Sequence, residues 1–229
     1  MNIFSTLPRK LAAILAIGVL TLGMWHVNSG NEPGATSLGQ LIGNGAANAQ
    51  SDDMAEALPD MFLGDEDAPI TIYEYASFTC PHCGRFHKDV FPQLKANFID
   101  TGKVRFGLRE VYFDRYGLWA GMVARCGGEE RYYGIVDILF SKQAEWSRHD
   151  DPNVVVEQLK LIGRQAGLDD EATQACLQDQ DNAQAMVNDF QLKAGADGIE
   201  STPSFVINGD KFSNMSYSDL ESILGERLN

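Results

Sequence analysis

Residues 70–83 read Ile-Thr-Ile-Tyr-Glu-Tyr-Ala-Ser-Phe-Thr-Cys-Pro-His-Cys, an apolar run that ends in two cysteines separated by two residues. The β-branched and aromatic residues at its start predict a buried strand. After Cys83 the apolar residues recur every four positions, which predicts a helix, and Pro92 predicts a kink within it. The order strand, Cys-x-x-Cys, helix places Cys80 where helix amides and the helix dipole favour a thiolate. The stretch therefore predicts a redox-active dithiol.

The chain has four cysteines, so a structural zinc site has to be considered. Cys126 and Cys176 stand alone, without the paired spacing that zinc sites usually show. This favours the redox interpretation, and we expect no metal and no cofactor. A module that binds a soft metal, such as copper, through two thiolates remains the alternative outside the enzymes.

Two motifs carry a resemblance to a known family. The segment 74–83 resembles the active-site segment of the DsbA family of thioredoxin-fold thiol oxidases, in which proline and histidine usually separate the cysteines. Thr202-Pro203, followed by a predicted strand at 204–207, resembles the cis-proline loop of that family. From about Ala68 to the C-terminus, element order carries the rest of the resemblance. It implies an α/β, thioredoxin-like fold with an α-helical insertion.

The motif chemistry assigns a role to three residues. Cys80 lies nearest the helix start, so we expect it to be the attacking thiolate that forms a mixed disulfide with a client. Cys83 is expected to resolve that intermediate. His82, in the first turn, is expected to donate to the Cys80 sulfur or to balance its charge. A solvated loop histidine is the alternative.

The resemblance implies two further site elements. Glu74 corresponds to the buried acid of the family, where a carboxyl group with a raised pKa shuttles the Cys83 proton. A partly solvated Glu74 is the alternative. A cis bond between Thr202 and Pro203 would expose the Thr202 backbone, which then pairs with an extended client segment.

Other charged residues near the motif carry weaker indications. Arg109 and Glu110, at the end of a predicted strand, belong either to the site or to a surface pair. His87 is predicted to lie on the solvated face of the helix, together with Arg85 and Lys88.

The pattern changes along the remainder of the chain. Periodicity is helical over 114–195, which predicts an insertion in a thioredoxin-like domain at 68–229. Strand character returns at Thr202, where Asn208-Gly209 predicts a type I′ hairpin turn. A capping box at 218–221 predicts the start of the last helix.

The N-terminus has the composition of a targeting segment. Two basic residues precede the apolar run 11–25, which is short and glycine-interrupted for a membrane span. Residues 1–49 are therefore expected to be a signal peptide, with an uncleaved membrane anchor as the alternative, and 50–67 a polar linker. In both cases we expect the domain in the periplasm, where disulfides persist.

Cys126 and Cys176 are expected to form a structural disulfide inside the helical insertion. The pairing leaves Cys80 and Cys83 free to cycle between thiol and disulfide. Two buried free thiols are the alternative, because lone cysteines also serve as small core residues.

The net charge of −14 argues against nucleic acid as a partner, because phosphate binding needs a cluster of basic residues that this sequence does not supply. The leading hypothesis is an exported thiol:disulfide oxidoreductase that introduces disulfides into reduced client proteins. The resemblance implies that a membrane quinone-linked partner re-oxidises it. A disulfide isomerase or reductase remains open, because threonine rather than an aliphatic residue precedes Pro203.

Overall fold

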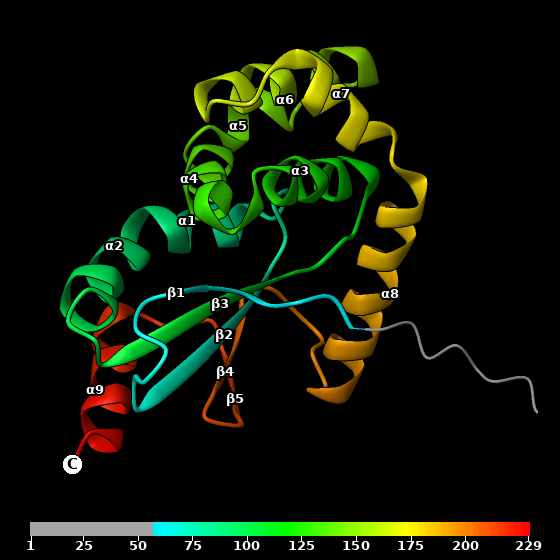
Figure 1. The fold of residues 1–229 in the computed structure, drawn as a ribbon. Helices are drawn as coiled ribbons and strands as arrows, with labels where there is room; N and C mark the ends of the chain where they lie inside the picture. Colours follow the sequence, from blue (N-terminus) through cyan, green and yellow to red (C-terminus); the bar gives the residue numbers. More distant parts are fainter. Residues whose placement is uncertain (1–56) are drawn as a thin grey trace, which may run out of the picture. The chain divides into compact units, whose positions relative to one another are not determined.

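The computed structural model describes residues 57–229, and the segment expected to be a signal peptide or anchor lies outside this range. The described part of the chain contains one five-stranded sheet in the order β1-β3-β2-β4-β5 (Figure 1). Its strands are β1 (Met61–Leu63), β2 (Ile70–Ala76), β3 (Val104–Glu110), β4 (Ser204–Ile207) and β5 (Asp210–Ser213).

Strand β2 lies at the centre of the sheet. It pairs in parallel with β3 and antiparallel with β4, while β1 and β5 form the edges. A parallel pair needs a crossover connection, which the helical segments after the cysteine motif provide. The apolar run of β2 follows from this position, because both of its faces are covered.

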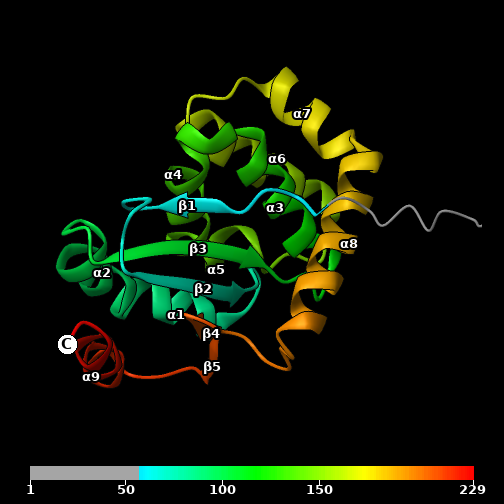
Figure 2. The ribbon, with the colours of Figure 1, turned by 60° about the horizontal axis from the view of Figure 1, so that its bottom comes forward.

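The helices form two groups. The crossover contains α1 (Pro81–Asp89), α2 (Phe91–Leu94) and the π-helical turn η1 (Lys95–Ile99). Between β3 and β4 lie α3 (Arg115–Cys126), α4 (Gly128–Ser141), α5 (Gln143–Trp146), α6 (Pro152–Gln165), α7 (Asp170–Gln178) and α8 (Gln180–Ala196). The last helix is α9 (Tyr217–Arg227). Figures 1 and 2 show α3, α4, α6 and α7 gathered on one side of the sheet, with α8 leading back to β4. The predicted thioredoxin-like fold with an α-helical insertion is confirmed.

Local sequence explains several helix starts. The Asp114 carboxylate accepts from two backbone amides at the start of α3, and the Asp151 carboxylate does the same once for α6. Pro152 then occupies the first turn of α6, where its missing N–H has no cost. The hairpin between β4 and β5 forms as predicted, with positive φ angles at Asn208 (48°) and Gly209 (93°).

Three sequence-based expectations need correction. The expected linker 50–67 contains β1, which pairs with β3 and so belongs to the sheet. Pro92 does not kink one continuous helix. It lies in the first turn of α2, a separate helix that begins after α1 ends at Asp89. The cap of α9 is Ser216, whose hydroxyl accepts from the Asp219 amide, rather than a box that begins at Ser218.

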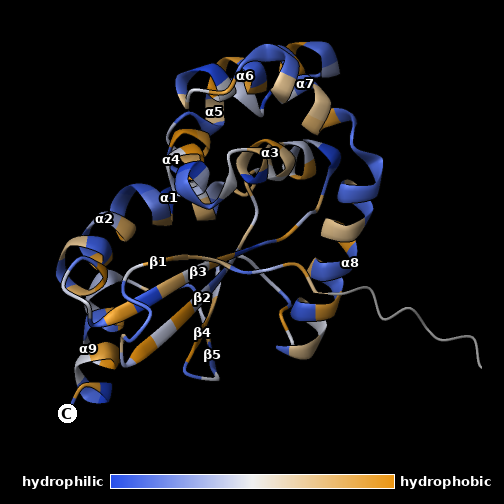
Figure 3. Ribbon diagram, in the orientation of Figure 1, coloured by the Kyte–Doolittle hydropathy of each residue, from blue (hydrophilic) through white to orange (hydrophobic). Residues whose placement is uncertain are grey.

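The core joins the sheet to the insertion. Most of its largest fully buried side chains come from β2, β3, β4 and α4, and Phe78, Leu94 of α2 and Trp146 of α5 complete the set. Figure 3 shows that α8, in contrast, is largely hydrophilic. No helix within residues 57–229 is long and apolar enough to cross a membrane.

Candidate active site

Cys80 and Cys83 lie at the start of α1, directly after β2 and its connecting turn. Cys80 is the N-cap residue, and Pro81 takes the first helical position, where its ring favours helical φ. Both cysteines are free thiols in this structure. Cys80 is half-buried and Cys83 is fully buried, so only Cys80 is open to a partner molecule.

The environment of Cys80 favours its thiolate. A hydrogen bond from Cys83 is the main cause that lowers the pKa of Cys80, to about 5. The side chain of Thr202 and the backbone amides of Cys83 and His82 lower this pKa further, and partial burial opposes them. These amides belong to the first turn of α1, where unpaired N–H groups stabilise an anion. At neutral pH the Cys80 sulfur is therefore a nucleophile.

Cys83 has the opposite character. The hydrogen bond with Cys80, burial and the negative charge of Glu74 all raise the pKa of the Cys83 thiol. The pair therefore carries one negative charge, which is located on Cys80. Cys83 stays protonated, and its S–H group donates a hydrogen bond to the Cys80 thiolate.

The cis-proline loop lies against the cysteines. The Thr202–Pro203 peptide bond is cis. The Cys80 sulfur and the carbonyl oxygen of Thr202 lie 3.6 Å apart, close enough for a hydrogen bond when Cys80 is protonated. Pairing of β2 with β4 brings the loop here, because Thr202 precedes β4 by two residues.

A groove of about 330 Å³ ends at Thr202. It is lined mainly by apolar side chains from α8, from the segment after β3 and from the loop before Pro203, including Val111, Phe113, Phe190 and Ile199. Phe113 is 63% exposed, the highest value among the large apolar side chains of the described residues.

Glu74 is fully buried on β2, and its partner is His87 of α1. The Glu74 Oε2 and His87 Nε2 atoms lie 2.8 Å apart. The His87 ring also stacks on Phe140 of α4, with 3.9 Å between ring centroids and 14° between the planes. The expectation that His87 is solvated is wrong: it lies one helical turn after Cys83, on the helix face that packs against the sheet.

The His82 side chain lies at the surface. Arg85 Nη2 donates to His82 Nδ1 at 2.7 Å, which leaves the other ring nitrogen to carry the proton of the neutral form. The contribution of His82 to the Cys80 thiolate in this structure comes from its backbone amide.

Sequence reasoning missed Gln143, which belongs to α5 in the insertion. Its side-chain amide donates to the carbonyl oxygens of Phe78 at 2.8 Å and Cys80 at 2.9 Å. A Cβ atom at Gly84 would lie 2.6 Å from the Gln143 Oε1 atom, so a residue without a side chain lets this contact form. No local signal points to Gln143, because it lies 63 residues from Cys80 in the sequence.

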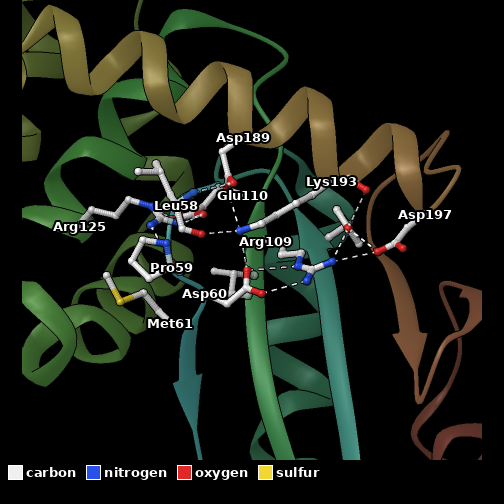
Figure 4. Close-up of polar contacts among 12 residues, drawn as sticks. Leu58, Pro59, Asp60, Met61, Arg109, Glu110, Arg125, Asp189, Lys193 and Asp197 are labelled. Carbon is white, nitrogen blue, oxygen red and sulfur yellow. Dashed lines mark hydrogen bonds and ion pairs between the residues drawn. The ribbon is translucent and has the colours of Figure 1, made fainter. Parts of the chain in front are cut away.

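Arg109 and Glu110 lie in a polar network with charged residues of α3, α8 and the segment before β1 (Figure 4). Arg109 forms ion pairs with Asp60 and Asp197, both at 2.9 Å. Glu110 pairs with Arg125 at 2.7 Å. These contacts connect β3 to α3, to the end of α8 and to the segment before β1.

The segment before β1 is held by the same network. Lys193 of α8 donates to the Leu58 carbonyl oxygen and pairs with Asp60, while the Leu58 amide donates to Asp189 (Figure 4). The polar character of α8 is explained by these contacts, because its charged side chains bind a neighbouring chain segment rather than solvent alone.

In the insertion, a disulfide joins Cys126 at the end of α3 to Cys176 of α7. Among the residues that the structure describes, no group of three or more His, Cys, Asp or Glu side chains is arranged to hold a metal ion.

The fold and the cysteine site define a thioredoxin-fold protein with an asymmetric dithiol. Comparison with known proteins agrees: the family model described as thioredoxin matches residues 56–226. The crystal structure of Wolbachia pipientis alpha-DsbA1 is similar, with 31% sequence identity and a TM-score of 0.68, over 74% of this chain and 91% of that one. The chain belongs to the DsbA family of thioredoxin-fold proteins.

Two sequence relatives extend this comparison. "Putative protein-disulfide oxidoreductase" of Rickettsia bellii (strain RML369-C) is 32% identical over 170 residues, which are 74% of this chain and 64% of the relative. "Disulfide bond formation protein D" of Bacillus subtilis (strain 168) is 25% identical over 174 residues, which are 72% of this chain and 76% of the relative. The chain thus spans less than two thirds of the Rickettsia protein.

Proposed function

We propose that this protein is a thiol:disulfide oxidoreductase that introduces disulfides into reduced client proteins through Cys80 and Cys83. The low pKa of Cys80, about 5, is the observation that carries the proposal. A stabilised thiolate is a good leaving group and makes the reduced form of the protein favourable. The disulfide form is then a strong oxidant.

The reaction consists of two exchanges. A client thiolate attacks Cys80 Sγ, the Cys80–Cys83 bond breaks, and Cys83 leaves as a thiolate that takes up a proton. A second client thiolate then attacks the client sulfur of the mixed disulfide, and Cys80 leaves as a stable thiolate. The client loses two electrons, and the dithiol pair of the protein gains them.

The cis-proline loop is the proposed client site. A client in extended conformation pairs with the Thr202 backbone as an added strand, beside the attacked sulfur. The apolar groove that ends at Thr202 supports a preference for unfolded clients, since their exposed apolar side chains fit its lining. Glu74 is the proposed proton acceptor and donor for Cys83.

The cellular setting is part of the proposal. Residues 1–49 act as a signal peptide or membrane anchor, so that the thioredoxin-like domain works in the periplasm. The disulfide between Cys126 and Cys176 supports an oxidising compartment. A membrane quinone-linked partner, which the family membership suggests, accepts the electron pair and restores the Cys80–Cys83 disulfide.

Oxidation of a client tests the function. The oxidised protein is mixed with an unfolded, fully reduced model protein that has two cysteines, and the client thiols are counted. We expect loss of two client thiols for each Cys80–Cys83 disulfide consumed, and no loss with the Cys80→Ser variant. A client that keeps both thiols would contradict the proposal.

A further inference from the structure

The buried carboxyl group of Glu74 has one unused oxygen. His87 binds Oε2, whereas Oε1 has no hydrogen-bond partner, and it is the one buried side-chain oxygen or nitrogen in residues 57–229 in that condition. An unpaired buried oxygen is costly, so each one in a native structure calls for an explanation, and a catalytic role is one of these. Glu74 Oε1 is thus available to bind a proton that arrives during the reaction.

Cys83 is the neighbouring group that has a proton to give. It is fully buried, as is Glu74, so its proton has no direct path to water. In the free dithiol Cys83 donates to Cys80, but a mixed disulfide at Cys80 removes that acceptor. The charge of Glu74 also acts on Cys83, which indicates that the carboxylate lies within electrostatic reach of the thiol.

His87 connects Glu74 to the surface. The histidine is only 7% exposed, yet it lines two surface hollows of about 340 and 390 Å³. Imidazole has two ring nitrogens, so a proton bound at one side is matched by a proton released from the other. Since Nε2 binds Glu74, Nδ1 is the nitrogen that remains to exchange with water.

We propose that Cys83, Glu74 and His87 form a proton route, in which His87 carries the proton between the buried carboxyl group and water in the hollows. The proposal rests on the proposed exchange chemistry of Cys80 and Cys83. As the Cys83 sulfur attacks Cys80 Sγ, its proton passes to Glu74 Oε1, and the disulfide bond to the bound thiol breaks. In this route the pair starts as a carboxylate and an imidazolium. Oε1 takes up the Cys83 proton, Nδ1 releases a proton to water, and the net charge of the pair is unchanged, while the leaving thiolate departs with the electron pair.

Other ionisable groups face this route and need controls. Lys88 of α1, Lys95 of η1, and Tyr133 and Asp137 of α4 line the hollows, and Asp137 lines both. Asp137 is the one carboxylate among them, so its removal tests whether a charge at the mouth, rather than His87, produces the pH dependence.

Rapid-quench mixing of the reduced protein with oxidised glutathione separates the relevant steps. In the first phase the mixed disulfide forms at Cys80, and the rate of this phase rises with the concentration of oxidised glutathione. In the second phase Cys83 attacks the mixed disulfide. The rate of this phase does not depend on the glutathione concentration, but it depends on the loss of the Cys83 proton. Both phases are measured from pH 5 to 9, by quenching and mass spectrometry.

His87→Gln is the central variant, because its amide reproduces the Nε2 donor but does not titrate. His87→Leu removes both properties. Phe140→Leu keeps the Glu74–His87 pair and removes only the ring stacked on it. Asp137→Asn removes the carboxylate at the mouth of the hollows. We expect the second phase to slow by at least about tenfold in both His87 variants and to lose its dependence on pH near neutrality.

The first phase should stay within about twofold of the parent at each pH in all four variants, because its nucleophile is the Cys80 thiolate and it needs no proton transfer from Cys83. A second phase in His87→Gln that equals the parent's, or one that slows equally in Phe140→Leu or Asp137→Asn, would overturn the route. Absence of the first phase in the parent protein would instead contradict the proposed exchange chemistry at Cys80.

Discussion

Thr202 reaches Cys80 across 122 residues of sequence, with its carbonyl oxygen 3.6 Å from the Cys80 sulfur. Its side chain also lowers the pKa of Cys80 by a hydrogen bond. The residue before the cis-proline therefore acts on the cysteine in two ways: its backbone lies where a client would pair, and its hydroxyl group tunes the sulfur.

Thr202→Val should raise the pKa of Cys80, because valine keeps the shape of threonine but cannot donate to the thiolate. Thr202→Ser retains the hydroxyl group and should keep the lower pKa. The thiolate absorbance at 240 nm, followed against pH in the reduced protein, measures both. Identical titration curves for the parent and the valine variant would contradict the role of the hydroxyl group.

The reduced protein should gain stability with rising pH between about 5 and 9. Cys80 titrates at about 5 in the folded state against 9.0 for an unperturbed thiol, so in this interval the unfolded chain binds one more proton. Stability therefore rises with pH, is complete above the unfolded pKa, and is lost as the pH falls through the folded pKa.

Thermal unfolding of the reduced protein and of Cys80→Ser at several pH values checks this. The Tm difference between them should shift in favour of the reduced parent as the pH increases from 5 to 8. A difference that does not change with pH would show that Cys80 has an ordinary pKa.

Gln143→Leu should destabilise the protein by about 1–3 kcal/mol, since the buried Phe78 carbonyl oxygen would lose its side-chain donor and the Cys80 carbonyl oxygen would keep only the Gly84 amide. The same change should disturb the cysteine turn, because one of these carbonyls belongs to Cys80. Urea denaturation measures the free energy of unfolding, and the exposed Gln178→Leu serves as the matched control. Equal stability of the two variants would mean that Gln143 does not support the turn.

Some of this arrangement is predictable from sequence, because it depends on local patterns. The buried strand before Cys80, the hairpin at Asn208-Gly209 and the extent of the helical insertion all follow from periodicity or turn chemistry. His87 stands between basic residues and so has the composition of a solvated face, although its spacing of four from Cys83 indicates a shared helix face. Gln143 depends on tertiary packing, so no pattern near it reveals the contact.

The disulfide between Cys126 and Cys176 should contribute about 4 kcal/mol in the chain-entropy model, since it closes a loop with a sequence separation of 50. The double variant Cys126→Ser/Cys176→Ser should accordingly unfold at a lower urea concentration.

In the oxidised protein, mild reductant should open the Cys80–Cys83 bond first, because an oxidising disulfide is reduced before a structural one. Peptide mapping under non-reducing conditions would expose the opposite order.

The reduction potential of the Cys80–Cys83 pair tests the central claim most directly. The protein is equilibrated with glutathione redox buffers at pH 7, and the fraction of reduced Cys80–Cys83 pair is measured by alkylation and mass spectrometry. If the stabilised Cys80 thiolate makes the disulfide an oxidant, the potential lies well above the value of about −270 mV that is typical of thioredoxin. A potential at or below that value would contradict the account and indicate a reductase.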